Sequence, residues 1–182
     1  MIQATNLGYP RIGKKRELKH ALEQFWSGKL SEATLQEQAA SLRKEHWFLQ
    51  QRLGLHHIPS NDFSLYDQVL DTIALVGAVP ERYHWNGERV DLHTYFAMAR
   101  GIQQTQASDE DIPAMEMTKW FDTNYHYLVP EFSANQTFRL ASTKPIDEFV
   151  EAKALGIQTR PVLLGPISFL LLGKTHQPDM HP

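Results

Sequence analysis

Helical spacing of apolar residues over the first fifty positions is the feature that most constrains the fold of this chain. From Lys15 to Lys29 the apolar side chains recur at the i, i+3, i+4, i+7, i+8 spacing of one helix face, and Gly28 lies where that helix should stop. Ser31 is suited to cap a second helix, which Gly54 would close. The stripe of this second helix comprises Leu35, Ala39, Leu42, His46, Leu49 and Leu53. The pattern predicts two consecutive helices.

Short extended runs alternate with further helices along the rest of the chain. Strands or extended runs are predicted at Gln3–Leu7, Leu55–Pro59, Asn124–Val129, Thr137–Leu140 and Thr159–Leu164, the last of them a buried parallel strand that Gly165-Pro166 ends. Helices are predicted around three stripes: Leu65, Val69, Ile73 and Val76; Leu92, Tyr95, Phe96 and Ala99, with Asp91 as cap; and Ile146, Phe149, Val150 and Ala154, between Pro145 and Gly156. A loop is expected at Gln103–Pro113 and a frayed tail at Lys174–Pro182. This alternation predicts the α/β class with a parallel sheet.

Composition excludes several classes of function. A chain of 182 residues with 42% apolar and 21% charged residues is long enough for one sizeable core. Its formal charge of −3 gives no case for nucleic acid, which a strongly basic face would bind. The absence of cysteine removes disulfides, thiolate metal sites and cysteine nucleophiles.

The hydropathy pattern predicts no membrane association. The amino terminus lacks the basic region and long apolar run of a signal peptide. The longest apolar stretch, Ile167–Leu172, is far too short to span a bilayer. We therefore expect a cytoplasmic location.

Five cations gather at and just inside the start of the first predicted helix: Arg11, Lys14, Lys15, Arg16 and Lys19. The helix dipole favours acids at this end, so a basic cluster here suggests a compensating carboxylate or phosphate. Arg16 and Lys19 are three residues apart and would share a helix face, where they could grip one anion together. The alternative is a solvated basic turn.

The segment Glu116–Tyr127 mixes polar, cationic and aromatic side chains without an amphipathic period. Such mixtures are typical of loops that enter a strand at the rim of a domain, where binding residues concentrate. The alternative is a loop whose aromatic side chains plug the core while Lys119 is solvated.

The nine histidines show no metal-ligand spacing. His56 and His57 would point to opposite sides of a strand, so they cannot share a metal. His46 lies on an apolar helical stripe and is interpreted as a core histidine. We therefore expect no metal site in this chain.

Three segments together resemble a known family. They are "GYPRIG" at Gly8–Gly13, "RELK" at Arg16–Lys19 and "MTKWFDTNYHYLVPE" at Met117–Glu131. They are similar to the amino-terminal domain of the cobalamin-independent methionine synthase family. The resemblance extends to Leu65–Thr72, Ala97–Gly101 and Arg160–Pro166, and so covers essentially the whole chain, residues 1–182.

The resemblance implies a fold and an activity. The family builds two face-to-face (β/α)8 TIM barrels, and these residues match about the first half of the amino-terminal barrel. Because such a barrel needs about 250 residues, we expect the chain to be part of a longer protein. The family transfers the methyl group of 5-methyltetrahydrofolate, in its polyglutamate form, to homocysteine. Carried over to this sequence, the residues that bind the folate substrate are Arg16, Glu17, Leu18, Lys19 and Lys119.

The resemblance also implies that catalysis lies elsewhere. The family uses zinc, without cobalamin, and holds it with histidine, cysteine and glutamate ligands in a carboxyl-terminal barrel that also takes homocysteine. This chain has no cysteine, so we expect it to carry no catalytic or metal-binding residue, to be inactive alone and to support the catalytic barrel. One alternative is an interaction module that pairs with itself or with a separate zinc-bearing chain. Another is an independent hydrolase or isomerase, with Glu116 and Asp122 as its best acid/base candidates.

Overall fold

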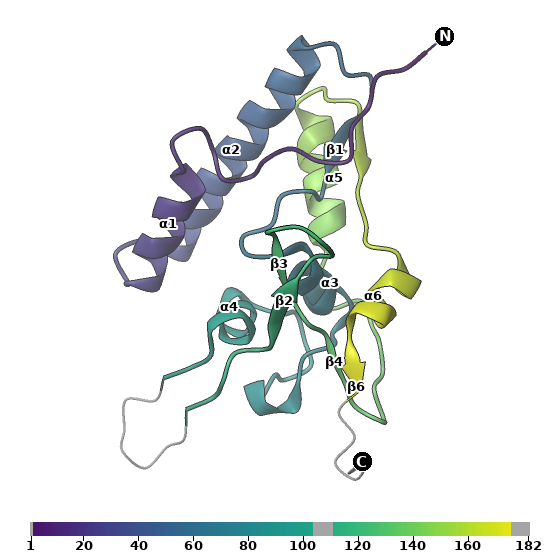
Figure 1. Cartoon of the computed structure of the whole chain (residues 1–182). Coiled ribbons are helices and arrows are strands. Elements are labelled where there is room, and N and C mark those ends of the chain that lie inside the picture. Colours follow the sequence, from purple (N-terminus) through teal and green to yellow (C-terminus); the bar gives the residue numbers. More distant parts are fainter. Residues whose placement is uncertain (1, 104–110, 176–182) are drawn as a thin grey trace. The chain divides into compact units, whose positions relative to one another are not determined.

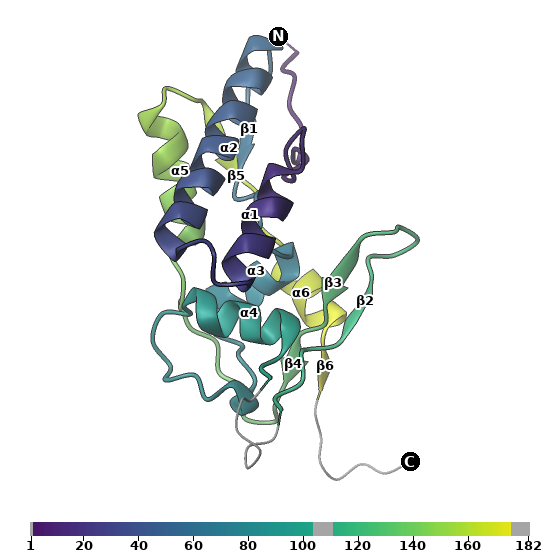
Figure 2. The ribbon, with the colours of Figure 1, turned by 90° about the vertical axis from the view of Figure 1, so that its left-hand side faces the viewer.

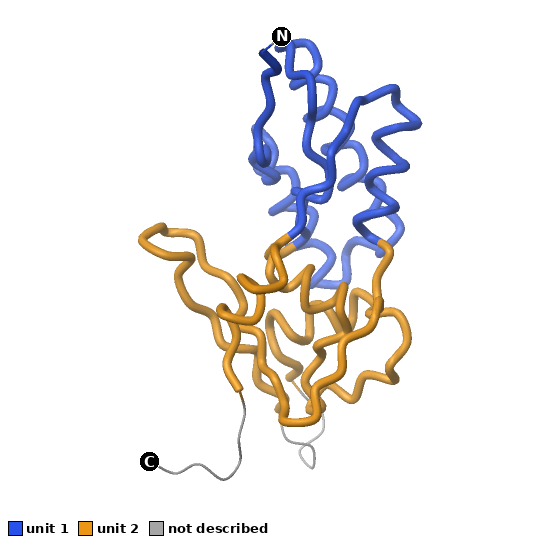
Figure 3. Tube along the Cα trace, turned by 90° about the vertical axis from the view of Figure 1, so that its right-hand side faces the viewer, with its two compact units in different colours: residues 1–65, 144–163 blue, residues 66–143, 164–182 orange. Residues whose placement is uncertain are grey.

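The computed structural model of the chain describes residues 2–103 and 111–175. The chain divides into two compact units, each built from two separate stretches (Figure 3). Unit 1 comprises Met1–Leu65 and Lys144–Leu163, and unit 2 comprises Tyr66–Thr143 and Leu164–Pro182. Helices and short strands occur in both, which confirms the predicted mixture of α and β structure.

Unit 1 is built from three helices and one pair of strands (Figure 1). Its elements are α1 (Glu17–Trp26), α2 (Glu32–Arg52), β1 (Ile58–Ser60), α5 (Lys144–Ala154) and β5 (Thr159–Pro161). Strands β1 and β5 pair in parallel, with Ile58 opposite Thr159. The predicted parallel pairing is therefore confirmed, but β5 is half-buried to exposed rather than buried.

The hairpin of α1 and α2 follows the predicted periodicity. The hydroxyl of Ser31 accepts a hydrogen bond from the backbone N–H of Thr34 at 3.2 Å and so caps α2. The buried side chains of the hairpin include Leu18, Ala21, Leu22, Leu35, Ala39 and Leu42. Leu53 was expected on the same stripe, but it lies one residue past the end of α2 and is 69% exposed.

A small apolar cluster holds the β1–β5 pair against α2 and α5. It consists of Trp47, Ile58, Ala152 and Ile157. The indole N–H of Trp47 donates to the carbonyl of Pro59 at 3.0 Å, so the buried ring also satisfies a strand carbonyl. The strand predicted at Gln3–Leu7 is wrong: only one parallel bridge, between Thr5 and His57, forms there.

The buried face of α5 differs from the prediction. Ile146 and Val150 are each 57% exposed, whereas Glu148 is buried. The carboxylate of Glu148 accepts from the backbone N–H of Asn61 at 2.8 Å and lies 3.0 Å from the ammonium group of Lys144. Burial of a carboxylate is tolerated here because its partners satisfy it, so tertiary contacts override the apolar stripe.

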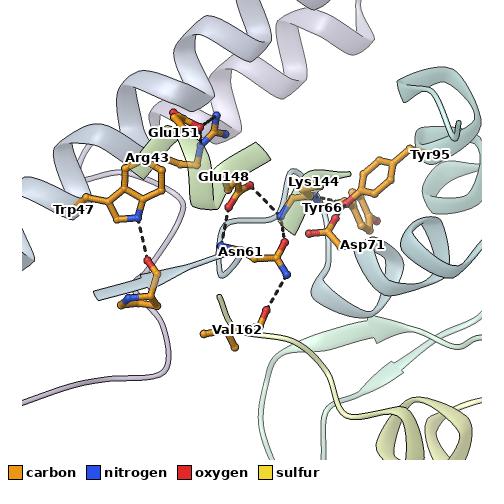
Figure 4. A network of polar contacts seen from close by, with 11 residues as sticks. Arg43, Trp47, Asn61, Tyr66, Asp71, Tyr95, Lys144, Glu148, Glu151 and Val162 are labelled. Atoms are coloured by element: carbon orange, nitrogen blue, oxygen red, sulfur yellow. Dashed lines mark hydrogen bonds and ion pairs between the residues drawn. The ribbon is translucent and has the colours of Figure 1, made fainter. Parts of the chain in front are cut away.

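Asn61 lies at the carboxyl end of β1 and joins that strand to β5 (Figure 4). Its side-chain amide donates to the carbonyl of Val162 at 2.7 Å, and its amide oxygen accepts from Lys144 at 3.0 Å. Asn61 has φ 59°, a left-handed conformation that asparagine tolerates better than most residues. The chain therefore turns sharply after β1 with its backbone groups satisfied.

Unit 2 contains the remaining elements. They are α3 (Gln68–Val76), the short 3₁₀ helix η1 (Glu81–Tyr83), α4 (Leu92–Arg100), β2 (Met117–Lys119), β3 (His126–Leu128), β4 (Glu131–Phe132), α6 (Pro166–Leu172) and β6 (Lys174–Thr175). Asp91 caps α4 as predicted, with its carboxylate 2.7 Å from the backbone N–H of Thr94. Helix α3 begins at Gln68 rather than at Leu65, because Asp67 is its cap.

Two pairs of strands form in unit 2, and they differ in direction. Strands β2 and β3 are antiparallel, and β4 and β6 are parallel. The predicted strand at Asn124–Val129 is confirmed as β3, whereas Thr137–Leu140 forms no strand. Lys174 and Thr175 were predicted to fray but form β6. Most of the loop predicted at Gln103–Pro113, and residues 176–182 of the predicted tail, lie outside the described residues.

Helix α6 was missed because Gly165-Pro166 was interpreted only as a break. Proline is favoured in the first turn of a helix, and here Pro166 starts α6. The ring of Phe169 on this helix packs edge-on against Phe132, with ring centroids 5.5 Å apart. The chain passes close to β4 at Gly173, just before β6 pairs with β4. A Cβ atom on Gly173 would collide there with the ring of Phe132.

Asp62 ties the amino-terminal loop of unit 1 to the end of β1. Its carboxylate accepts a hydrogen bond from the backbone N–H of Tyr9 at 2.8 Å. Burial raises the pKa of Asp62 to about 6, even though the hydrogen bond from Tyr9 opposes the shift. Because the folded state holds the proton more tightly than the unfolded chain, ionisation of Asp62 costs stability as the pH rises from about 4 through 6.

We predict that Asp62→Asn raises the free energy of unfolding at pH 7.5 by about 1–3 kcal/mol, since a shift of about two pKa units corresponds to at most ~3 kcal/mol. An amide can still accept from Tyr9 but carries no charge. Urea titrations at pH 4 and pH 7.5 measure the effect, which should vanish at the lower pH. Asp122→Asn, at an exposed aspartate, is the control. A loss of stability at both pH values would contradict the prediction.

Candidate functional site

The basic loop in front of α1 is ordered by the first residue of that helix. The carboxylate of Glu17 turns back and accepts a hydrogen bond from the backbone N–H of Lys15 at 2.9 Å. Gly13 has φ 83°, a left-handed conformation that favours glycine, and a Cβ atom there would also collide with this carboxylate. The pKa of Glu17 is lowered, first by its own backbone N–H and further by that of Lys15. Glu17 therefore supplies the acid that the helix dipole favours.

Leu18 anchors the same loop from the inside. Its side chain is fully buried, and its backbone N–H donates to the carbonyl of Ile12 at 3.2 Å. The side chain of Leu18 thus contributes packing, and the loop is held to α1 by one carboxylate and one buried leucine.

The cations of the cluster have different environments. Lys14 lies 3.2 Å from Glu45, and Lys19 lies 3.6 Å from Glu23. Arg16 is exposed, and it pairs with no acidic group among residues 2–103 and 111–175. Arg16 does not share a helix face with Lys19 as expected, because it precedes the helix with φ 63°. The left-handed backbone turns Arg16 out of the helical repeat.

Lys119 is the last residue of β2, in the hairpin that β2 forms with β3 (Figure 2). In the register of the hairpin Lys119 lies opposite His126. The prediction of a loop before the strand is therefore wrong for Met117–Lys119, which is itself a strand. Lys119 is exposed and has no acidic partner in the part of the chain that the structure describes.

Three aromatic rings pack edge-on in and beside the turn of the hairpin. Trp120 packs edge-on against Phe121 and Tyr127, with ring centroids 5.2 Å and 5.7 Å apart. Tyr127 is buried, whereas Phe121 is 72% exposed and has φ 49°. In the alternative interpretation of this segment the aromatic side chains plug the core, which holds for Tyr127 but not for Phe121.

Asp67 anchors the hairpin, and sequence reasoning missed it. Its side chain is 1% exposed, and burial raises its pKa. It accepts from the hydroxyl of Tyr125 at 2.8 Å and from the backbone N–H groups of Leu70 and Leu128 at 2.9 Å and 3.1 Å. The available signal was an aspartate before an apolar helical stripe, which indicates a cap but not a contact with a distant strand.

A second pair, formed by the buried Tyr95 and the half-buried Asp71, lies beside this anchor. The hydroxyl of Tyr95 on α4 donates to Asp71 on α3 at 2.6 Å and accepts from the backbone N–H of Tyr66 at 3.2 Å, and these residues are drawn in Figure 4. Burial raises the pKa of Tyr95 well above its usual range, so the phenol stays neutral and donates. The pair fixes α4 on α3.

The two acid/base candidates, Glu116 and Asp122, lie near the hairpin in different environments. Glu116 lies 2.6 Å from the ammonium group of Lys174 in an ion pair that links the residue before β2 to β6. Asp122 is exposed in the hairpin turn.

The described residues offer no set of metal ligands. No group of three or more histidine, cysteine, aspartate or glutamate side chains converges in residues 2–103 and 111–175. His56 accepts from the backbone N–H of Ala4 at 3.0 Å. His46 is buried, its ring packs at a tilt against that of Tyr9, and burial lowers its pKa, in keeping with a core histidine. The zinc that the resemblance implies does not fit these residues.

None of the helices that the structure describes is both long and apolar enough to cross a membrane.

The two parts of the candidate site belong to different units. Arg16, Glu17, Leu18 and Lys19 lie in unit 1, and Lys119 lies in unit 2. Their convergence on one ligand therefore stays a prediction.

Comparison with known proteins assigns the chain to a family. A family model described as "Cobalamin-independent synthase, N-terminal domain" matches residues 3–182. Proteins named 5-methyltetrahydropteroyltriglutamate–homocysteine methyltransferase are similar over almost the whole chain. The relative from Salinibacter ruber is 62% identical over 99% of this chain, that from Caulobacter vibrioides 55% over 100% and that from Chelativorans sp. 61% over 95%.

The chain spans about a quarter of the length of these relatives, with 24%, 25% and 23% of each covered. The match extends over both units and includes the basic loop and the hairpin. The chain therefore belongs to the cobalamin-independent synthase family and corresponds to its N-terminal domain.

Proposed function

We propose that this chain is the folate-side part of a cytoplasmic methyltransferase that moves the methyl group of 5-methyltetrahydrofolate to homocysteine. The match of residues 3–182 to the family carries this proposal. The names of the similar proteins supply the two substrates. In this role the chain binds the polyglutamate tail of the folate and supports a catalytic part outside these residues.

The tail-binding role is supported by the chemistry of the basic loop and the hairpin. A polyglutamate tail is a string of carboxylates, and exposed cations on ordered backbone suit such a ligand. Arg16 can form a two-pronged contact with a carboxylate, whereas Lys19 and Lys119 act as point charges. Glu17 and Leu18 hold the loop that ends in Arg16, and Lys19 follows them in the first turn of α1.

We further propose that the chain forms about the first half of a (β/α)8 barrel. The parallel pairings β1–β5 and β4–β6 support this architecture, since barrel strands are all parallel. In a barrel the active site lies at the carboxyl ends of the strands. Asn61 and Asp62, which hold the chain after β1, occupy such an end.

The part of the chain that the structure describes offers no set of zinc ligands for this proposed reaction. No cysteine is present in the sequence, and no cluster of potential ligands forms among the described residues. Activation of homocysteine is therefore assigned to a part of the protein outside this chain.

We predict that Lys119→Gln weakens binding of folate triglutamate about three- to tenfold and leaves monoglutamate binding nearly unchanged. An exposed charge-assisted contact of roughly 0.7–1.4 kcal/mol corresponds to this range. Isothermal titration measures both affinities in a chimera in which residues 3–182 replace the matching segment of the Salinibacter ruber relative.

Lys153→Gln, which neutralises an exposed lysine on α5, is the matched control for this experiment. It should change neither affinity. Equal weakening of both ligands by Lys119→Gln would contradict the tail-binding role.

We predict that the chain alone binds less than 0.1 equivalent of zinc (about one site in ten), because thiolate ligands are absent and its histidines are dispersed. Metal analysis after dialysis against zinc tests this expectation. One equivalent of tightly bound zinc, lost on His56→Ala or His57→Ala, would show that the histidines had been misread.

A second candidate function is an interaction module, which exposed apolar side chains favour. On α6, Ile167, Leu170 and Leu171 are 73%, 50% and 80% exposed. Apolar side chains gathered on one short helix are typical of surfaces that are covered by another element or chain.

We therefore predict that the chain alone self-associates, and that α6 contributes to the contact. Sedimentation over a wide range of concentration should show dimers or larger species, and Leu171→Lys should shift the distribution towards monomer. A stable monomer at every concentration would contradict the prediction. Leu53→Lys, at an exposed leucine beyond the end of α2, is the control.

A further inference from the structure

We propose that Asp67 and Tyr125 are positioning residues that form a latch between α3 and the β2–β3 hairpin and thereby fix the direction in which Lys119 points. The latch consists of the hydrogen bonds from Tyr125 and Leu128 to the Asp67 carboxylate. The inference rests on the proposed role of Lys119 in binding the folate tail. It adds two residues that contact no ligand but determine how selective the site is for long tails.

The hairpin needs such an anchor. Strands β2 and β3 are three residues long each, and an isolated two-stranded hairpin is marginally stable in water. Their antiparallel pairing is extended by bonds from Trp120 N–H to the carbonyl of Tyr125 at 2.7 Å and from Val129 N–H to the carbonyl of Glu116 at 2.8 Å. These bonds hold the strands to each other but not to the rest of unit 2.

The carboxylate of Asp67 supplies bonds that tie the hairpin to α3. One oxygen accepts from the hydroxyl of Tyr125, and the other accepts from the backbone N–H of Leu128. The second oxygen also accepts from Leu70 N–H in the first turn of α3. A single buried side chain thus joins the start of α3 to Leu128 in β3 and to Tyr125 just before β3.

Tyr125 and Leu128, the two residues bonded to Asp67, lie on either side of the position opposite Lys119. Lys119 pairs with His126, which lies between Tyr125 and Leu128 in sequence. Bonds on both sides of His126 restrict rocking and twisting of the hairpin around that position. Lys119 lies at the turn end of β2, and Met117 lies at the other end. A change in the direction of the hairpin would therefore move the ammonium group of Lys119 more than it would move Met117.

The hydroxyl of Tyr125 is the part of the latch that can be removed with least damage. Tyr125 is 37% exposed, so its ring is not a core element. Tyr125→Phe removes one donor to Asp67 and the acceptor of a 3.4 Å hydrogen bond from the backbone N–H of Gln68, and it leaves Asp67 its two backbone donors. Tyr127→Phe is the matched control, because that hydroxyl donates to the carbonyl of Leu172 at 3.3 Å and makes no bond to Asp67.

The first experiment measures the latch in this chain without any ligand. We expect Tyr125→Phe to raise hydrogen exchange at the backbone N–H groups of Trp120 and Leu128 at least fivefold, while the buried amides of α4 keep their protection. Tyr127→Phe should leave the exchange of Leu128 within twofold of the unaltered chain. Unchanged exchange in Tyr125→Phe would overturn the latch.

The second experiment measures tail selectivity in the chimera described above. We expect Tyr125→Phe to lower the ratio of triglutamate to monoglutamate affinity about three- to fivefold, with monoglutamate affinity preserved. In a Lys119→Gln background the same substitution should have no further effect on the ratio, because its influence acts through that lysine. Asp67→Asn should lower the ratio in the same direction.

The outcomes separate this inference from the proposed function. If Lys119→Gln abolishes the selectivity while Tyr125→Phe leaves it intact, the positioning role is overturned and the tail-binding role stands. If Tyr125→Phe lowers the ratio equally with and without Lys119, the latch does not act through that lysine and the inference is overturned. If the unaltered chimera shows no selectivity, the proposed function fails, and the role given to the latch fails with it.

Discussion

The carboxylate of Asp67 receives three hydrogen bonds from two elements that are far apart in sequence, and the architecture of unit 2 depends on it. Leu70 belongs to α3, whereas Tyr125 and Leu128 belong to the hairpin region. Removal of this acceptor would leave buried N–H groups unsatisfied, which costs about 1–3 kcal/mol for each group. The hairpin that carries Lys119 therefore takes its position from a residue about fifty positions earlier in the chain.

Carboxylates organise unit 1 in the same way. Asp62 holds the backbone of Tyr9, Glu148 holds that of Asn61, and Glu17 holds that of Lys15. In each case an acidic side chain satisfies a backbone N–H in a turn that regular secondary structure leaves unpaired. Of the cations proposed to bind the folate tail, Arg16 lies on the loop that Glu17 orders, Lys19 lies in the first turn of α1 and Lys119 ends β2. Acids order the backbone, and bases such as Arg16 and Lys119 remain open to solvent.

The sequence predicted the long helices well because their signals are local. Periodicity and a capping hydroxyl were sufficient for α2, and the aspartate cap was sufficient for α4. Strands of two or three residues are too short for an alternating pattern, so Met117–Lys119 and Lys174–Thr175 were missed. The buried face of α5 was predicted wrongly because Glu148 is buried. Its partners are Asn61, which follows β1, and Lys144, which lies one turn earlier on α5 itself. Motif resemblance named Arg16, Lys19 and Lys119, but only coordinates could connect Lys119 to Asp67.

If these residues bind the glutamate tail of a folate, the contacts are largely Coulombic, because cations meet carboxylates. The most direct test is the salt dependence of tail selectivity in the unaltered chimera, measured by titration with triglutamate and monoglutamate from 50 mM to 500 mM salt, a range over which the Debye length falls from roughly 14 Å to about 4 Å. We expect triglutamate to bind more tightly than monoglutamate at low salt and its advantage to shrink steadily as salt rises. Equal affinity for the two ligands at low salt, or an advantage that salt leaves unchanged, would contradict this expectation.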